Sequence, residues 1–216
     1  MSNKQTIMKR IFDVCISSVG LTVLWPVILL CILVSRLELG ENGLFRQERV
    51  GQHGKHFWIY KVKTMKSAAV ASDSITVAGD SRIYRFGRLF RALKFDEFPQ
   101  LWNVLRGDMS LVGPRPDVPG YADQLPINFS EILLLKPGIT GPASIKYRNE
   151  EELLGSCRNP EYVNDTVIYP DKVLINLDYG SNWSLRTDIR YLMMTVGLMK
   201  IPKELVVDEL VDFCKS

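Results

Sequence analysis

The chain has 216 residues, 46% of them hydrophobic and 24% charged. This composition supports one folded domain with a substantial core and excludes an intrinsically disordered chain. The formal net charge of +3 is too small to indicate a nucleic-acid-binding protein, so nucleic acid is not an expected partner. Nothing in the composition fixes the oligomeric state.

An almost continuous apolar segment runs from Ile11 to Val34. As a helix it would extend roughly 36 Å, enough to cross a hydrocarbon core of about 30 Å, so a membrane-spanning helix is one interpretation. Pro26 interrupts the segment and predicts a bend there. Basic residues flank both ends: Lys4, Lys9 and Arg10 precede the segment, and Arg36, Arg46 and Arg49 follow it.

Positive charge on both flanks places both ends of this segment on the cytoplasmic side by the positive-inside rule. We therefore expect residues 1–38 to form a re-entrant helix, which enters the lipid bilayer, bends at Pro26 and returns. Residues 39–216 are expected to form one functional unit on the cytoplasmic face.

The next stretch predicts a small β-hairpin followed by a basic helix. Leu44–Val50 and Phe57–Val62 are β-prone runs on either side of a glycine-containing loop at 51–55. Ser67–Ser81 is small and polar and predicts a loop. The apolar residues that follow have the spacing of one helical face: Ile83, Phe86, Phe90 and Leu93.

Two adjacent carboxylates, Asp96 and Glu97, follow this basic helix. Asp is a favoured N-cap, so Asp96 is expected to cap a helix with Pro99 in its first turn and Gly107 at its end. The positive helix end, and Arg91 if it folds back, would both favour ionised carboxylates. The alternative is that Asp96 is a simple cap and Glu97 an ordinary first-turn acid.

Two prolines flank Arg115 and stiffen the backbone on both sides of it, which favours binding of an anion by a pre-positioned guanidinium. A proline-rich turn with an exposed arginine is the alternative. Downstream, Ser130–Leu135 is expected to be helical and to end at the turn formed by Lys136–Gly138.

The rest of the chain predicts two short elements around a loop at 158–160, followed by two helices. Glu150–Leu154 and Asp165–Tyr169 are short, and Asp188–Met199 and Lys203–Phe213 are amphipathic helices separated by Pro202. Their apolar faces fit either a protein core or a membrane surface. The fold class expected is α+β and mainly helical, with the re-entrant helix, one small hairpin and interfacial helices around a single domain.

Three blocks of this sequence resemble the bacterial sugar transferase family, the monotopic phosphoglycosyl transferases. The longest block, Arg91–Pro116, reads RALKFDEFPQLWNVLRGDMSLVGPRP, and Tyr60–Met65 and Lys136–Gly141 match further family blocks in the same order. The resemblance covers nearly the whole chain. It is to the small form of the family, which consists of the catalytic unit alone.

The resemblance implies transfer of a sugar 1-phosphate from a UDP-sugar to a polyprenyl phosphate, such as undecaprenyl phosphate, with release of UMP. It implies that Asp96 is the nucleophile and forms a covalent phosphosugar intermediate. It also implies a requirement for Mg²⁺, with Asp96 and Glu97 as candidate ligands and Glu97 either holding the metal or positioning the acceptor. The expected location is the bacterial inner membrane, where the enzyme would start synthesis of a polysaccharide, O-antigen, capsule or glycoprotein glycan.

The resemblance further implies that Arg91, Lys61 and Arg115 bind substrate phosphate and that Arg148 lies near the nucleotide. Around Arg148 the sequence departs from the family pattern, because Pro142 replaces a common tryptophan and residues 146–149 replace an Asn-Gly-Arg-Asn pattern. The sugar is not identified by any residue. A non-catalytic, membrane-anchored adaptor that binds acidic lipids is the alternative function, but it leaves the two carboxylates unexplained.

Overall fold

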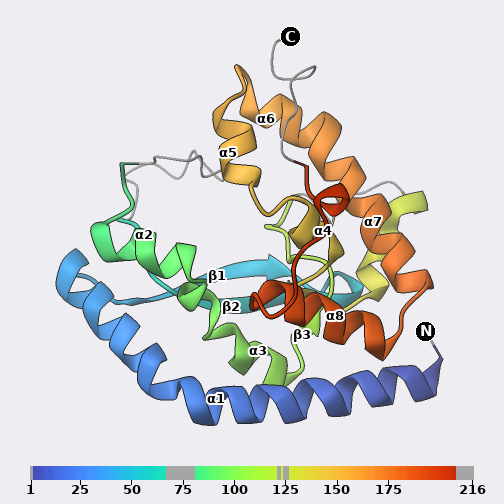
Figure 1. Ribbon diagram of the computed structural model, residues 1–216, viewed down its shortest axis with the longest axis horizontal. Coiled ribbons are helices and arrows are strands. Elements are labelled where there is room, and N and C mark those ends of the chain that lie inside the picture. The colour runs from blue at the N-terminus through green and yellow to red at the C-terminus, as the bar shows by residue number, and fades with distance from the viewer. Residues whose placement is uncertain (1, 67–80, 121–122, 124–126, 208–216) are drawn as a thin grey trace.

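The computed structural model describes residues 2–66, 81–120, 123 and 127–207. The fold is α+β and mainly helical, as expected (Figure 1). Its helices are α1 (Asn3–Leu39), α2 (Arg85–Ala92), α3 (Gln100–Arg106), α4 (Pro142–Lys146), α5 (Glu150–Gly155), α6 (Pro160–Val163), α7 (Tyr169–Ser181) and α8 (Leu185–Thr195). Its strands are β1 (Leu44–Val50), β2 (His56–Val62), β3 (Ser110–Val112) and β4 (Gly138–Thr140).

Five short irregular helical elements complete this list. Four are 3₁₀ turns, η1 (Gln52–Gly54), η2 (Phe95–Glu97), η4 (Ile127–Leu134) and η6 (Lys203–Leu205), and η5 (Asn164–Ile168) is a π-helix. The segment predicted as a helix at Ser130–Leu135 therefore belongs to the 3₁₀ element η4.

The predicted hairpin is confirmed. Strands β1 and β2 pair antiparallel from Leu44 opposite Val62 to Val50 opposite His56. A second, parallel pair joins β3 to β4, with Ser110 opposite Gly138 and Val112 opposite Thr140. The sequence did not predict this pair, because three-residue strands are too short to show an alternating pattern.

The main hydrophobic core lies between the hairpin, α3, β3 and the C-terminal helices. It includes the buried side chains Ile59, Val104, Met109, Val112 and Trp183. Helix α3 packs against both α1 and β2. The segment between the two carboxylates and Arg115 therefore runs directly through the core.

Helix α1 is one continuous helix that includes Pro26, and Figure 1 shows it turning toward α2 in its last third. It begins at a capping box on Ser2 and ends at Gly40, which has a φ of 68°. The helix is long and apolar enough to cross a membrane by length and composition. The predicted helix and bend are thus confirmed.

Polar contacts join both ends of α1 to the rest of the protein. Arg10 donates to the carbonyl oxygens of Val104 and Leu105, at 2.6 and 2.8 Å, which caps the C-terminal end of α3. Near the other end, the Ser35 hydroxyl donates to the carbonyl oxygen of Lys63 at 2.5 Å. One domain therefore holds both ends of α1.

Several element predictions need correction. Ile83 forms a β-bridge with Met65 ahead of α2, and Phe86 and Leu93 are exposed, so Phe90 is the member of the predicted helical face that α2 buries. The predicted loop at Ser67–Ser81 lies almost entirely outside the described residues. The predicted apolar residues therefore do not form a continuous buried face, because α2 has only two turns and exposes most of its arginines.

The C-terminal half is more helical than predicted. The short element expected at Asp165–Tyr169 is part of a continuous helical run, in which the π-helix η5 joins α6 to α7. Helix α8 is capped by Ser184 and begins at Leu185, three residues before the predicted start, and it ends at Thr195, before Met199. At Lys203 the described residues form a single 3₁₀ turn, and the remainder of the predicted last helix, 208–213, lies outside the described residues.

A buried ion pair anchors the start of α1 to α8. Lys9 Nζ lies 2.5 Å from Asp188 Oδ2, and Asp188 is completely buried. Asp188 also accepts hydrogen bonds from the hydroxyl of Tyr179 at 2.6 Å and the indole of Trp183 at 2.9 Å. The packing of α1 under the domain therefore depends on one fully paired buried carboxylate.

Replacing Lys9 by Met should lower the free energy of unfolding by on the order of 3 kcal/mol, because it leaves the Asp188 charge buried without its cation. The measurement is denaturant unfolding in detergent micelles. Lys4→Met, at an exposed position of the same helix, is the matched control and should change stability little. Equal effects of the two substitutions would contradict this role for the ion pair.

Candidate active site

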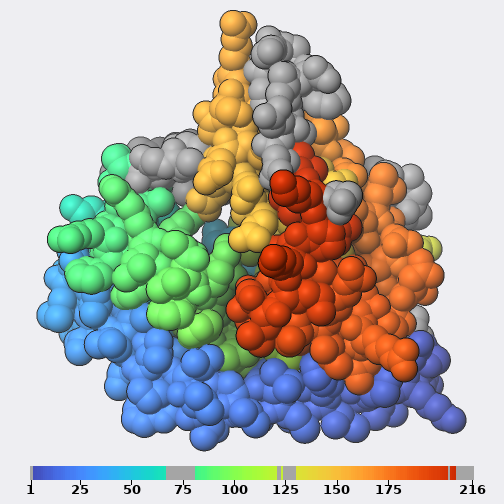
Figure 2. Space-filling view, viewed as in Figure 1, coloured from blue at the N-terminus to red at the C-terminus, as the bar shows by residue number. Residues whose placement is uncertain are grey.

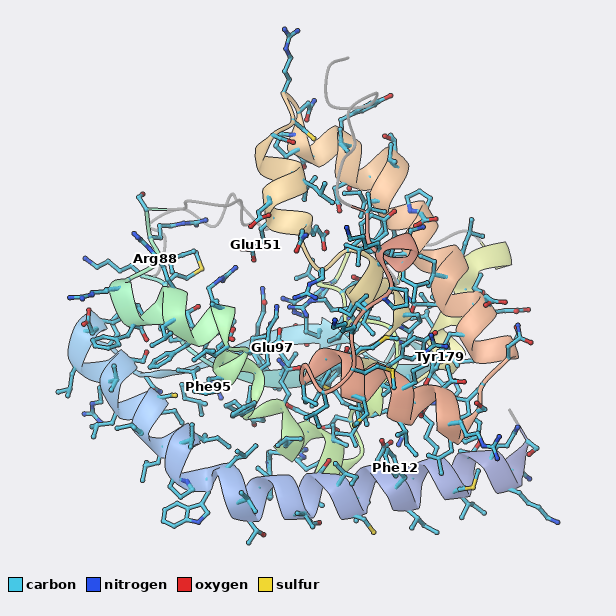
Figure 3. All side chains as sticks on the ribbon, in the orientation of Figure 1. Phe12, Arg88, Phe95, Glu97, Glu151 and Tyr179 are labelled. Atoms are coloured by element: carbon cyan, nitrogen blue, oxygen red, sulfur yellow. The ribbon has the colours of Figure 1, made fainter. Side chains whose placement is uncertain are left out.

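The acidic pair lies near the centre of the molecule. Figure 3 places Glu97 between the end of α2 and the C-terminal helices. Figure 2 shows a hollow on this face between α2 and the C-terminal segment that includes α8, with α5 above it. The carboxylates thus lie where residues from distant parts of the sequence meet.

Asp96 is not a helix N-cap, which corrects the sequence prediction. Phe95–Glu97 forms the 3₁₀ turn η2, which follows Lys94 in the left-handed conformation at a φ of 59°. The residue that precedes α3 is Pro99, and no side chain caps that helix. Because i to i+3 hydrogen bonds in η2 already use the amides of Glu97 and Phe98, the Asp96 carboxylate has no capping role.

Glu97 is buried and held by two cations. Its Oε1 atom accepts a hydrogen bond from Arg115 Nη2 at 2.9 Å and lies 3.6 Å from Lys61 Nζ. Burial alone would raise the pKa of Glu97, but the charges of Arg115, Lys61 and Lys94, together with the Arg115 hydrogen bond, lower it to about 2. Glu97 therefore stays ionised at physiological pH.

Asp96 has a different environment. It is 8% exposed, and its Oδ1 atom has no hydrogen-bond partner among the described residues. Burial, followed by the charge of Glu97, raises the pKa of Asp96 to about 6, against the opposing charges of Lys61, Lys94 and Arg91. Burial thus outweighs the influences that the sequence indicated in favour of the ionised form, but about nine-tenths of the group is ionised at pH 7, in agreement with the expected carboxylate.

Arg115 is positioned by backbone contacts on both sides. Pro114 accepts a hydrogen bond from the Gly138 amide at 2.7 Å, and Pro116 accepts one from Arg49 Nη1 at 3.0 Å. The guanidinium then reaches Glu97 while half of the side chain stays exposed. The loop thus presents a fixed cation to the hollow instead of a freely exposed arginine.

Two other predicted residues do not contact the acidic pair. Arg91 forms an ion pair with Glu151, which links α2 to α5. The charge of Arg91 still favours the ionised form of Asp96 by lowering its pKa. Arg148 is exposed and borders a separate open groove with Lys200 and Lys203.

Asp96 is also the residue that best fits a magnesium ion. Mg²⁺ binds carboxylate oxygens and usually completes its coordination with water and substrate phosphates. Asp96 Oδ1 is a buried oxygen without a partner, whereas Glu97 Oε1 already faces two cations. Among the described residues no group of three or more His, Cys, Asp or Glu side chains converges.

Sequence reasoning missed two residues of this site, Arg49 and Gln100. Both border a small cavity together with Lys61 and Arg115. Gln100 lies one turn after Asp96, a spacing that could have indicated a shared side of the chain. Arg49 had no sequence signal, because an arginine in a hairpin strand usually faces solvent.

Comparison with known proteins shows the family of this chain. The sequence model of the family described as bacterial sugar transferase matches residues 4–201. The chain belongs to the bacterial sugar transferase family. The match includes both carboxylates, Lys61 and Arg115, and it extends through α1 and the C-terminal helices.

Characterised and uncharacterised relatives align over most of this sugar transferase. It is 36% identical to the uncharacterized sugar transferase EpsL of Bacillus subtilis, over 88% of this chain and 86% of the relative. It is 35% identical to the UDP-glucose:undecaprenyl-phosphate glucose-1-phosphate transferase of Caulobacter vibrioides, over 87% and 68%. It is 34% identical to the undecaprenyl-phosphate galactose phosphotransferase of Salmonella typhimurium, over 89% of this chain and 40% of that longer protein.

Asp96→Asn should stabilise this sugar transferase at neutral pH. The folded-state pKa of Asp96 lies above its ordinary value of 3.8, so the stability that this group contributes falls as pH rises from about 4 to about 6. The substitution removes that penalty and should raise the free energy of unfolding at pH 7 by on the order of 2 kcal/mol, with no gain below about pH 4. Unfolding is measured against pH in the presence of a metal chelator.

The control for this experiment is Glu131→Gln, which neutralises an exposed carboxylate and should give no comparable gain. A variant at Asp96 that is less stable than the wild type at pH 7, or a gain that does not change with pH, would contradict the environment described for Asp96.

Proposed function

We propose that this protein transfers a sugar 1-phosphate from a UDP-sugar to undecaprenyl phosphate and releases UMP. The observation that carries the proposal is the buried Asp96 carboxylate, which has an oxygen without a partner among the described residues, beside a Glu97 that pairs with two cations. The names of the Caulobacter and Salmonella relatives supply the substrate class. The reaction would be the first membrane step in the synthesis of a bacterial glycoconjugate.

In the first step, a carboxylate oxygen of Asp96 attacks the phosphorus that carries the sugar. A bond forms between that oxygen and the phosphorus, and the bond from the phosphorus to the UMP oxygen breaks, so UMP leaves with the electron pair. The product is a mixed anhydride between Asp96 and the sugar phosphate. Covalent catalysis of this kind divides one difficult displacement into two easier ones.

In the second step, a phosphate oxygen of undecaprenyl phosphate attacks the same phosphorus. The bond from Asp96 to the phosphorus breaks and the free carboxylate returns. The soluble donor and the lipid acceptor thus need not occupy the site together. This order suits one substrate from water and another from the membrane.

The charges around the carboxylates offset the repulsion between Asp96 and the donor. Two like charges about 4 Å apart repel by roughly 4 kcal/mol at an effective dielectric constant near 20. Lys61, Lys94 and Arg91 all favour negative charge at Asp96. Arg115, already aligned by Glu97, presents its exposed part to an incoming phosphate.

Mg²⁺ is proposed as the cofactor, and the Asp96 carboxylate would hold it, with Glu97 as the adjacent second carboxylate. When bound, it would neutralise charge on the transferred phosphate. The role of Glu97 in this proposal is to hold Arg115 and Lys61 in place. That role follows from its two cation contacts and does not depend on the metal.

The contacts of α1 support a re-entrant helix at the cytoplasmic face of the inner membrane. Lys9 and Ser35 are separated by roughly 39 Å of helix, more than the thickness of a hydrocarbon core, yet both contact the same domain. The opposite side of the helix exposes more than half of many large apolar side chains: Ile7, Ile11, Val19, Val23, Trp25, Leu29, Leu30, Leu33 and Leu37. An apolar surface of this extent suits lipid.

Purified wild-type protein should release UMP when supplied with Mg²⁺, undecaprenyl phosphate and the correct member of a UDP-sugar panel. Asp96→Asn should reduce release by roughly a thousandfold or more, because the amide is not a competent nucleophile. Chelation of Mg²⁺ should also stop release. The control Asp178→Asn changes an exposed carboxylate on α7 and should leave turnover unchanged.

Near-normal turnover by Asp96→Asn would overturn the covalent mechanism. Absence of UMP release with every UDP-sugar by wild-type protein would overturn the substrate class.

Labelling of single cysteines in intact cells tests the membrane placement. Ser2→Cys and Ser181→Cys, each in a background in which Cys15, Cys31, Cys157 and Cys214 are replaced by Ser, put the only thiol of the chain at an exposed position on α1 or α7. Both should resist a membrane-impermeant maleimide in intact cells and react after permeabilisation, because both positions face the cytoplasm. Labelling at position 2 from outside, with protection at position 181, would show a spanning helix instead.

A further inference from the structure

A small cavity lies beside the Glu97 ion pairs. Its volume is about 10 Å³, the space for roughly one water-sized group. The polar side chains that border it are Arg49, Lys61, Gln100 and Arg115, and none of the described residues that border it is acidic. Lys61 and Arg115 connect the cavity directly to the acidic pair.

Two hydrogen-bond donors at this cavity have no partner among the described residues. They are Arg49 Nε and the amide nitrogen of Gln100, and both atoms are buried. Gln100 is 3% exposed. Arg49 uses its terminal nitrogens elsewhere, on the Pro116 carbonyl at 3.0 Å and Gln47 Oε1 at 2.6 Å. Because buried donors are nearly always paired in folded proteins, these two indicate a missing acceptor.

The cations around the cavity outnumber the acids that pair with them, since Glu97 pairs with both Lys61 and Arg115. Burial and then the charge of Arg115 lower the pKa of Arg49 to about 10 and that of Lys61 to about 8. Glu97 favours the charged form of Lys61, and Asp117 that of Arg49, but neither acid offsets the downward shift. The cations therefore repel one another across the cavity, and an anionic oxygen there would relieve that repulsion.

We propose that Arg49 and Gln100 form a closed subsite for one oxygen of a substrate phosphate whose other oxygens contact Lys61 and Arg115. This inference rests on the proposed function, since it assigns new ligands to the phosphate of that reaction. Arg49 donates through Nε and Gln100 through its amide. A water molecule would satisfy the two donors but would bring no negative charge.

Inorganic phosphate and UMP are the binding probes, and affinity is measured by titration of the purified protein. Gln100→Leu removes the donor at similar volume and should weaken phosphate binding by about tenfold. Gln100→Glu keeps the shape and adds a negative charge, and should weaken it further. Asn176→Leu is the control, because Asn176 is another buried amide with an unpartnered atom but does not border the cavity.

Kinetics then identify which phosphate uses the subsite. A higher KM for the UDP-sugar alone assigns the subsite to the donor, and a higher KM for undecaprenyl phosphate alone assigns it to the acceptor; either result supports the proposal. Folded Gln100 variants with phosphate and UMP affinities within twofold of wild type would overturn the proposal and leave the cavity to a water molecule. Wild-type protein that binds neither probe would also overturn it. These titrations need no turnover, so they remain decisive even if the proposed reaction fails.

Discussion

The contact of Glu97 with Arg115 and Lys61 is the interaction on which the rest of the site depends. It joins the hairpin strand β2, the 3₁₀ turn η2 and the loop after β3, which are separated in sequence by 36 and 18 residues. Because Glu97 takes up both cations, the adjacent Asp96 keeps an oxygen free. Glu97 thus holds Lys61 and Arg115 in place, and Asp96 is the proposed nucleophile.

The long helix α1 makes this arrangement possible at a membrane. Its polar residues Lys9, Arg10 and Ser35 bind the domain, while its opposite side exposes apolar side chains. The carboxylates lie in η2, which contacts both α1 and β2. Under the proposed membrane placement, a lipid phosphate at the bilayer surface would meet a site that is built directly on α1.

Local patterns in the sequence predicted the long helix, the bend at Pro26 and the hairpin, because each is determined by periodicity or by proline within a short segment. The pairing of β3 with β4 and the continuous run from α6 to α7 depend on tertiary contacts and were not predictable in this way. At the site, the family resemblance indicated Asp96, Glu97, Lys61 and Arg115. The N-cap prediction was wrong because a 3₁₀ turn uses the amides that a cap would bind. The burial that raises the pKa of Asp96 depends on tertiary packing and cannot be predicted from the charged residues next to it in the sequence.

The most direct test of this account is to identify the side chain that carries the phosphosugar. Wild-type protein is incubated with Mg²⁺ and a UDP-sugar without acceptor, quenched in acid and digested with trypsin, and the peptide Phe95–Arg106 is fragmented in a mass spectrometer. The account predicts a peptide heavier by one sugar phosphate, with the added mass on Asp96 and lost on addition of undecaprenyl phosphate before the quench. An adduct on Glu97, or UMP release that needs acceptor and leaves the peptide unmodified, would contradict it.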